Sequence, residues 1–166
     1  DRIVMLAAAS TMTLALAALA LSWRGHASSD YWGVILTGWV VLGIAYSASI
    51  TPGGRLLRRS SGEAARPALF AAQFALSHLC WLIAYPLAGQ TGALGGMGLA
   101  FAAAAVLGLI GTGIAFLIWP REDAEVVEHG HDALPPDHPH LVEGHPGGRT
   151  RHAFVIDELH PHWPIR

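Results

Sequence analysis

Residues 67–119 read PALFAAQFALSHLCWLIAYPLAGQTGALGGMGLAFAAAAVLGLIGTGIAFLIW, a stretch that contains no Asp, Glu, Lys or Arg. An α-helix of about 20 apolar residues, rising about 1.5 Å per residue, crosses the roughly 30 Å hydrocarbon core of a bilayer. The stretch is long enough for two such crossings. We therefore predict one membrane helix over 67–88 and another over 93–119, joined by the short uncharged connector 89–92.

The same pattern continues toward the N-terminus, where the apolar runs 3–23 and 31–50 also lack charged side chains. Hydrophobic residues make up 52% of the chain, charged residues 13%, and the mean hydropathy is +0.41, a composition unlike that of soluble domains. The alternative, four successive charge-free helices of this length buried in a soluble protein, is improbable. We therefore predict an all-α fold, an integral membrane helical bundle with four transmembrane helices. Prolines are expected to stop or start these helices, namely Pro52, Pro67, Pro86 and Pro120.

The connector 51–66, TPGGRLLRRSSGEAAR, holds more arginines than the connectors 24–30 and 89–92. Arg-rich loops of membrane proteins face the cytoplasm. We therefore expect this connector and, by counting crossings, both ends of the chain to be cytoplasmic. These arginines would fix the topology and contact anionic lipid headgroups, or they would form ion pairs that latch one helix bundle to another. They are Arg55, Arg58, Arg59 and Arg66.

The chain divides into the predicted membrane helices, within 1–120, and a mostly irregular cytoplasmic tail over 121–166. Its start, Asp1-Arg2, leads directly into an apolar run, without an initiator Met or the cleavage site of a secretory signal. This start indicates a piece of a longer reading frame. Small residues favour close packing of membrane helices, so the GxxxG at 92–96 and the spacing of Ala104 and Gly108 suggest a larger bundle that includes N-terminal helices missing here.

Polar residues are rare within the predicted helices, and an ionisable side chain there is a functional candidate because its charge is costly in hydrocarbon. His78 is such a candidate, as part of a proton pathway or as a substrate contact. Gln73 lies on the same predicted helix, and Tyr46 lies near the end of the preceding one. The alternatives are a neutral histidine bonded to a neighbouring helix and a tyrosine packed between helices.

The tail is rich in histidine, and imidazole is a good ligand for Zn, Ni and Cu. We interpret the tail as a candidate low-specificity metal-binding segment, with a disordered, pH-sensitive tail as the alternative. Prolines and glycines predict no regular structure from 121 to 148. No zinc-finger spacing is present, so no structural metal site is expected and no cofactor is required. The candidate ligands are His129, His131, His138, His140, His145, His160 and His162.

The composition changes once more at the end of the chain, where HAFVIDELHPHWP occupies 152–164. Phe154, Ile156 and Trp163 make this stretch too apolar for a solvated coil. We expect it to dock on the cytoplasmic face of the membrane helices or on a partner.

Four stretches carry a family resemblance: Asp1-Arg2, TPGGRLLRRS at 51–60, RPALFAAQFALSHLCW at 66–81 and HAFVIDELH at 152–160. With them, the whole chain resembles the last third of a bacterial major facilitator superfamily transporter of the efflux type, over what would be transmembrane helices nine to twelve. The resemblance implies two six-helix bundles that rock about a central cavity, with cytoplasmic termini. It also implies coupling to protons through residues of the N-terminal half.

We therefore expect a fragment of a secondary-active transporter in the bacterial inner membrane, which works by alternating access and exports a small molecule or an ion. Two other classes remain open: a small four-helix accessory subunit of a membrane complex, and a metal-binding membrane protein that uses its tail. An enzyme is not expected, because no Ser/His/Asp arrangement, phosphate-binding glycine loop or HExxH pair is present. The lipid bilayer is the expected partner. Nucleic acid is not, since the net charge is −2.

Overall fold

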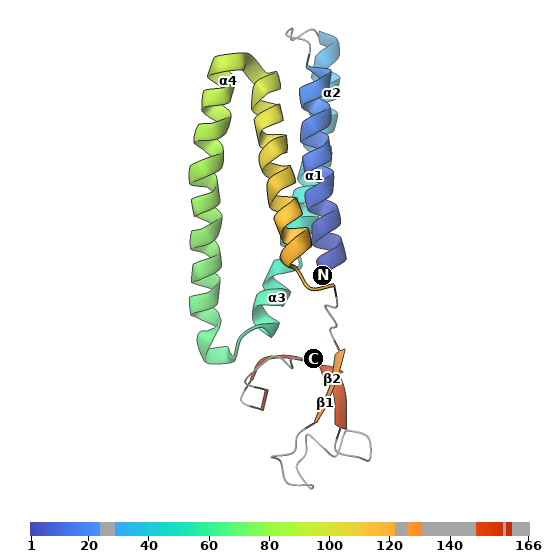
Figure 1. Ribbon diagram of the computed structural model, residues 1–166, viewed down its shortest axis with the longest axis vertical. Helices are drawn as coiled ribbons and strands as arrows, with labels where there is room; N and C mark the ends of the chain where they lie inside the picture. Colours follow the sequence, from blue (N-terminus) through green and yellow to red (C-terminus); the bar gives the residue numbers. More distant parts are fainter. Residues whose placement is uncertain (24–28, 122–125, 131–148, 158, 161–166) are drawn as a thin grey trace.

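The computed structural model describes residues 1–23, 29–121, 126–130, 149–157, 159 and 160. Within this part of the chain, three helices are long and apolar enough to cross a membrane. They are α1 (Arg2–Ser22), α2 (Ser29–Ile50) and α4 (Arg66–Ile118). Their long axes run roughly parallel in Figure 1. The predicted membrane helical fold is confirmed at this level, and α1 and α2 begin and end within two residues of the predicted ranges 3–23 and 31–50.

The third helix, α4, is 53 residues long and folds back on itself, so that it forms two antiparallel arms (Figure 1). The bend lies at Gly96, with φ 74 and ψ −173, a conformation open to glycine because it lacks a Cβ. We call residues 66–95 the outer arm and residues 97–118 the inner arm. The predicted connector 89–92 is wrong, because these residues are helical and the chain turns at Gly96 instead.

Pro86 also lies inside α4 and not at a helix end, contrary to the prediction. A proline removes one backbone hydrogen bond, but membrane helices tolerate this when neighbouring groups satisfy the freed carbonyl. Pro86 frees the carbonyl of Leu82, one turn earlier, yet α4 continues as a helix through Pro86 up to the glycine turn.

The helix α1 packs against both α2 and α4. Small residues allow the close approach: a Cβ on Gly38 of α2 would meet Leu19 of α1 at 2.9 Å, and a Cβ on Gly108 would meet Thr13 Oγ1 at 2.8 Å. The hydroxyls of Thr13 and Thr112 lie 3.5 Å apart across the α1–α4 interface. Gly108 therefore packs as its spacing predicted, whereas the GxxxG at 92–96 ends at the turn, because its last glycine is Gly96.

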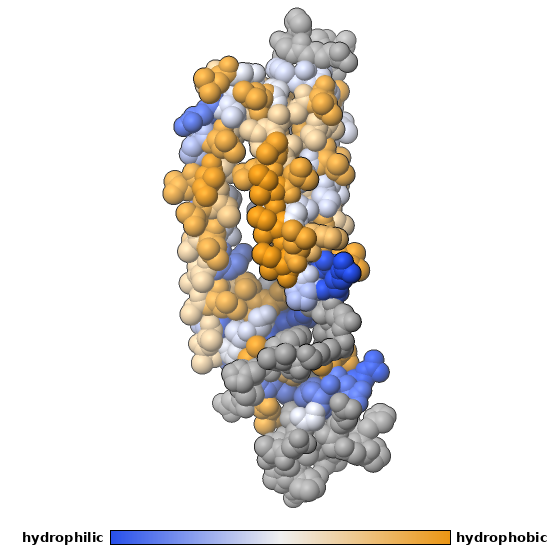
Figure 2. Space-filling view, in the orientation of Figure 1, coloured by the Kyte–Doolittle hydropathy of each residue, from blue (hydrophilic) through white to orange (hydrophobic). Residues whose placement is uncertain are grey.

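The outer arm stands apart from the other long helices (Figure 1), and none of its residues, all of which are described, is buried. Leu82 is 70% exposed and Tyr85 is 69% exposed. Figure 2 shows apolar side chains along much of this arm. A helix that is apolar on every side is suited to surroundings of lipid or of further membrane helices.

The connector between α2 and α4 contains two short elements, α3 (Gly53–Arg59) and the 3₁₀ turn η1 (Glu63–Ala65). Both lie at the lower end of the helices in Figure 1, the end at which the chain starts. Contacts join α3 to α2 and to α4. The arginine-rich connector is therefore folded against the helix ends.

Beyond α4, strands β1 (Val126–Gly130) and β2 (Arg149–Ala153) pair antiparallel, with Val126 opposite Ala153 and Gly130 opposite Arg149. The prediction that nothing regular forms before 148 is therefore wrong for β1. Its two valines are β-branched and favour extended backbone, and the first proline of the tail comes only at 135.

Candidate functional site

His78, the main candidate from the sequence, lies on the outer arm within a row of aromatic rings. Its ring centroid is 4.0 Å from that of Phe74 and 4.8 Å from that of Trp81. Trp81 in turn lies 6.1 Å from Tyr85. Residues spaced three and four apart share one side of a helix, so these four rings form a continuous stripe. We call it the aromatic stripe.

The imidazole of His78 is oriented by its own helix. Its Nδ1 lies 2.8 Å from the carbonyl oxygen of Phe74, and a carbonyl only accepts, so Nδ1–H is the donor in this bond. In a neutral ring, Nε2 is then an acceptor. His78 is exposed on this chain, so lipid or a further membrane helix can reach its ring.

The structure places the other two sequence candidates apart from His78. Gln73 is exposed on the outer arm, and its backbone carbonyl accepts a hydrogen bond of 2.9 Å from the hydroxyl of Ser77. Five positions separate Gln73 from His78, which is about 140° around a helix, so the two occupy different faces. Tyr46 is 53% exposed on α2, a helix that packs with α1 and α3. The three residues do not form one cluster within these helices.

The candidate arginines gather at the end of the bundle where the chain starts. Arg55 of α3 forms an ion pair with Asp1, and its Nε also donates a hydrogen bond of 3.3 Å to Asp1 Oδ2. The Asp1 side chain is only 4% exposed. Arg58 donates from Nε to the carbonyl of Gly54 within its own helix, at 3.3 Å. Arg55 thus links the connector to the start of α1 within this group of helices, and the two expected roles, lipid contact and a latch between bundles, stay predictions.

Arg2 makes contacts that the sequence did not indicate. It donates hydrogen bonds of 3.3 Å to the backbone carbonyls of Trp119 and Phe116 at the end of α4. Its guanidinium carbon also lies 5.3 Å from the centroid of the Phe116 ring. In the sequence, Arg2 stands out only as a basic residue directly before the first apolar run. Its partners lie more than a hundred positions away.

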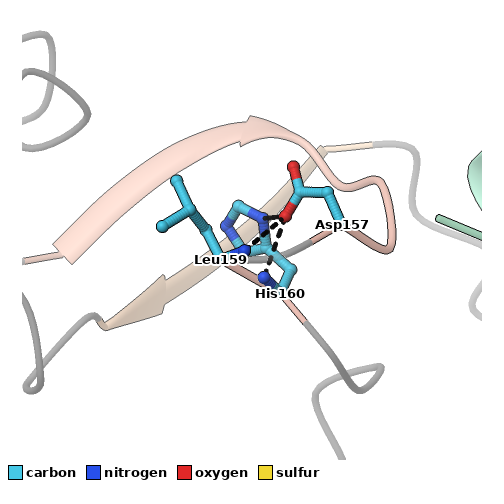
Figure 3. Close-up of polar contacts among 3 residues, drawn as sticks. All are labelled: Asp157, Leu159 and His160. Atoms are coloured by element: carbon cyan, nitrogen blue, oxygen red, sulfur yellow. Dashed lines mark hydrogen bonds and ion pairs between the residues drawn. The ribbon is translucent and has the colours of Figure 1, made fainter. Parts of the chain in front are cut away.

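The described end of the tail contains an ordered turn around Asp157 (Figure 3). One carboxylate oxygen, Oδ1, accepts from His160 Nδ1–H at 2.7 Å and from the backbone N–H groups of Leu159 and His160 at 3.0 and 2.9 Å. Burial alone would raise the pKa of Asp157, but these hydrogen bonds and the nearby imidazole hold the pKa below its ordinary value. The turn is therefore built for an ionised carboxylate.

Among the candidate metal ligands, the structure describes His129 and His160. Their ring centroids are 4.8 Å apart, and each lies 5.0 Å from the ring of Phe154. Phe154 is 3% exposed. Within the described residues, no group of three or more potential ligands gathers to hold a metal ion. The metal-binding hypothesis stays a prediction, and its other candidates lie outside the described residues: His131, His138, His140, His145 and His162.

A groove of about 590 Å³ runs between α1 and α2. Its walls include Leu19, Val34 and Val41, and its few polar groups include Ser22 and Thr37. The hydroxyl of Thr37 already donates to the carbonyl of Gly33, at 2.9 Å. The groove is mainly apolar and open to the outside of the bundle, a surface suited to helix packing.

These features together define a membrane protein of the polytopic helical class, and the three long helices that the structure describes carry charged residues only at their ends. The family model of the Major Facilitator Superfamily matches residues 1–154. The chain therefore belongs to this superfamily, a family of membrane transporters and not of enzymes. No curated protein and no solved structure matches the chain. The predicted superfamily and the general role in transport are confirmed.

Proposed function

We propose that the chain supplies the last four membrane helices, nine to twelve, of a twelve-helix bacterial exporter. In this proposal α1 and α2 each cross the bilayer once, and the two arms of α4 each cross it once. A straight helix of 53 residues would extend about 80 Å, far more than the roughly 30 Å of the hydrocarbon core. The turn at Gly96 supports two crossings.

The observation that carries the proposal is the uncovered outer arm. Most of its residues are apolar, and none of them is buried by α1, α2 or the inner arm. In a transporter of two six-helix bundles, earlier helices of the same protein would cover part of this arm and lipid would cover the rest. The groove between α1 and α2 offers those helices a second packing surface.

The proposed orientation places the connector and the tail in the cytoplasm and the Gly96 turn on the opposite side of the inner membrane. Arg2, Arg55 and the end of α4 lie together at one end of the helices, joined by the hydrogen bonds of Arg2 and the Asp1–Arg55 pair. Concentrated arginine marks a cytoplasmic end, and Arg58, Arg59 and Arg66 in the connector would contact lipid headgroups there.

A cysteine accessibility experiment tests this orientation. In a Cys80→Ser background of the complete protein, Ser60→Cys lies in the connector and Ala93→Cys lies near the turn. A membrane-impermeant maleimide added to intact cells is expected to label Ala93→Cys alone, and both cysteines after the membrane is opened. Labelling of Ser60→Cys in intact cells would reverse the proposed orientation.

His78 is the polar group that we propose for the transport pathway. With Nδ1–H bound to Phe74, its Nε2 would accept a proton or a hydrogen bond from the cargo. The aromatic stripe would offer apolar and π surface to an organic cation beside it. Gln73 and Tyr46 would contact the pathway at other points and would affect its selectivity.

Transport by the complete protein tests this role, with ethidium as the probe. Inverted membrane vesicles that carry the protein are expected to take up ethidium when a proton gradient is applied. His78→Asn keeps a polar side chain without the imidazole and is expected to abolish gradient-dependent uptake. Cys80→Ser, a neighbouring exposed position on the same arm, is the matched control. Equal uptake with and without the protein would count against an exporter of such cations.

A further inference from the structure

The described end of the tail returns to the connector between α2 and the outer arm. The backbone N–H of Ile156 donates a hydrogen bond of 3.0 Å to the carbonyl of Arg59. Arg59 is the last residue of α3, and the last carbonyls of a helix have no partner within that helix. The tail therefore supplies a backbone donor to the end of α3.

The contact extends along the connector beyond this hydrogen bond. A Cβ on Gly62 would meet the carbonyl oxygen of Ile156 at 3.9 Å, and Ser61 is only 8% exposed. Asp157 and Leu159 face residues 62–65 across a hollow of about 820 Å³. The tail thus follows the connector from the end of α3 to η1.

The docked segment has a fixed shape of its own. The rings of Phe154, His129 and His160 form one cluster, in which each centroid lies within 5.0 Å of the other two. This cluster joins β1 to the segment after β2. Asp157 closes the next turn through three hydrogen bonds to one carboxylate oxygen (Figure 3). The ordered side chains on this segment explain how the tail presents Ile156 to α3 in one orientation.

We propose that residues 153–157, together with Leu159 and His160, act as a strap, which fastens the end of the inner arm to the base of the outer arm. The strap is attached through β1 and β2 to the chain that leaves α4, and it docks on the connector that leads into α4. The outer arm has no buried residue, so packing against the other long helices does not hold it. Its base is held by α3, η1 and the strap. A further consequence rests on the proposed function: during the transport cycle, the strap restrains movement of the base of the outer arm.

Disulfide cross-linking tests whether the strap is docked in the membrane. The complete protein carries Cys80→Ser together with Gly62→Cys and Ile156→Cys, and copper phenanthroline is the oxidant. We expect an intramolecular disulfide, identified by mass spectrometry of the linked peptides. The control pair combines Gly62→Cys with Ala93→Cys, at the far end of the outer arm, and should not link. Failure of the first pair to link would overturn the docked strap.

Hydrogen exchange tests whether the strap holds the connector. Phe154→Ala removes the ring that contacts both histidines, whereas Val155→Ala changes a neighbouring, less buried side chain. Local release makes backbone amides exchange faster in the released segment. We expect faster exchange at 60–65 in Phe154→Ala only, with α1 unchanged in both variants. Equal exchange at 60–65 in the two variants would overturn the proposal.

The same cross-linked protein tests the effect on transport. Ethidium uptake is expected to slow after oxidation and to recover after reduction with dithiothreitol. Unchanged uptake in the linked protein would overturn the restraint on transport. If the parent Cys80→Ser protein moves no ethidium, the proposed export function fails, while the cross-linking and exchange results still decide whether the strap exists.

Discussion

Arg2, at the start of α1, donates a hydrogen bond of 3.3 Å to the backbone carbonyl of Trp119, at the end of α4. The carbonyls at a helix C-terminus carry partial negative charge, so a guanidinium is well suited to this place. Arg2 thereby joins the first helix of the chain to the last one, at the same end where Asp1 pairs with Arg55.

Replacing Arg2 should loosen this end of the bundle. Arg2→Ala removes two charge-assisted hydrogen bonds and is expected to lower the free energy of unfolding by about 1–2 kcal/mol. Arg2→Lys keeps the charge but cannot donate to both carbonyls in the same geometry. Its free energy of unfolding should lie between those of the parent protein and of Arg2→Ala. Thermal unfolding in detergent, followed by circular dichroism, gives the comparison. Arg58→Ala, which loses only a bond within its own short helix, is the control; equal losses in the two alanine variants would contradict the expectation.

The α1–α4 interface should not tolerate a methyl group at Gly108. Its Cβ would lie 2.8 Å from Thr13 Oγ1, and overpacking of this kind costs about 1–3 kcal/mol. Gly111→Ala is the matched control, because nothing lies within 4 Å of a Cβ there. Thr13→Ala combined with Gly108→Ala should recover part of the loss in the same unfolding measurement. A Gly108→Ala protein as stable as Gly111→Ala would show that the helices can separate without cost.

The turn between the arms should depend on the backbone of Gly96, although a Cβ there would meet nothing within 4 Å. At φ 74 an L-residue is strained, and such strain costs about 1–3 kcal/mol. Gly96→Ala is therefore expected to destabilise the protein. Gly89→Ala, at a helical and equally open position, should be neutral or stabilising by up to about 1 kcal/mol. The prediction fails if the two substitutions change the unfolding midpoint alike.

The strap should loosen in acid because of Asp157. Its pKa in the folded chain is held below the ordinary value for an aspartate, so the ionised carboxylate stabilises the fold above that ordinary value. This stabilisation is lost as the pH falls through the folded pKa. Amide exchange at Leu159 and His160, corrected for the intrinsic pH dependence, should therefore rise below about pH 4. Asp157→Asn should exchange fast already at pH 6; protection equal to that of the parent would contradict this role.

The positions of the long helices could be predicted because they depend on local composition. Charge-free runs of sufficient length are visible in the sequence without knowledge of any neighbour, and α1 and α2 follow the predicted ranges closely. The turn in α4 was harder to place, since several glycines lie between 89 and 98. Only the backbone shows which of them takes a positive φ, and that residue is Gly96.

The contacts at the lower end of the bundle could not be predicted in the same way. The partners of Arg2 lie at the other end of the helical part of the chain. Likewise β1 pairs with a strand about 20 positions later, so its own sequence shows only that two valines favour extended backbone. His78 was recognised as unusual from its place in an apolar run, but the stacking of its ring with Phe74 and Trp81 required the helix geometry.

The isolation of the outer arm also affects how the protein is made in the cell. As the chain leaves the ribosome, the outer arm enters the membrane before the inner arm exists, and none of its side chains becomes buried against α1 or α2. In the proposed twelve-helix protein, helices synthesised before Asp1 would shelter the outer arm during insertion. On that proposal, residues 1–166 expressed alone should be degraded faster by membrane-bound proteases than the same residues at the end of the twelve-helix protein, as pulse-chase labelling would reveal.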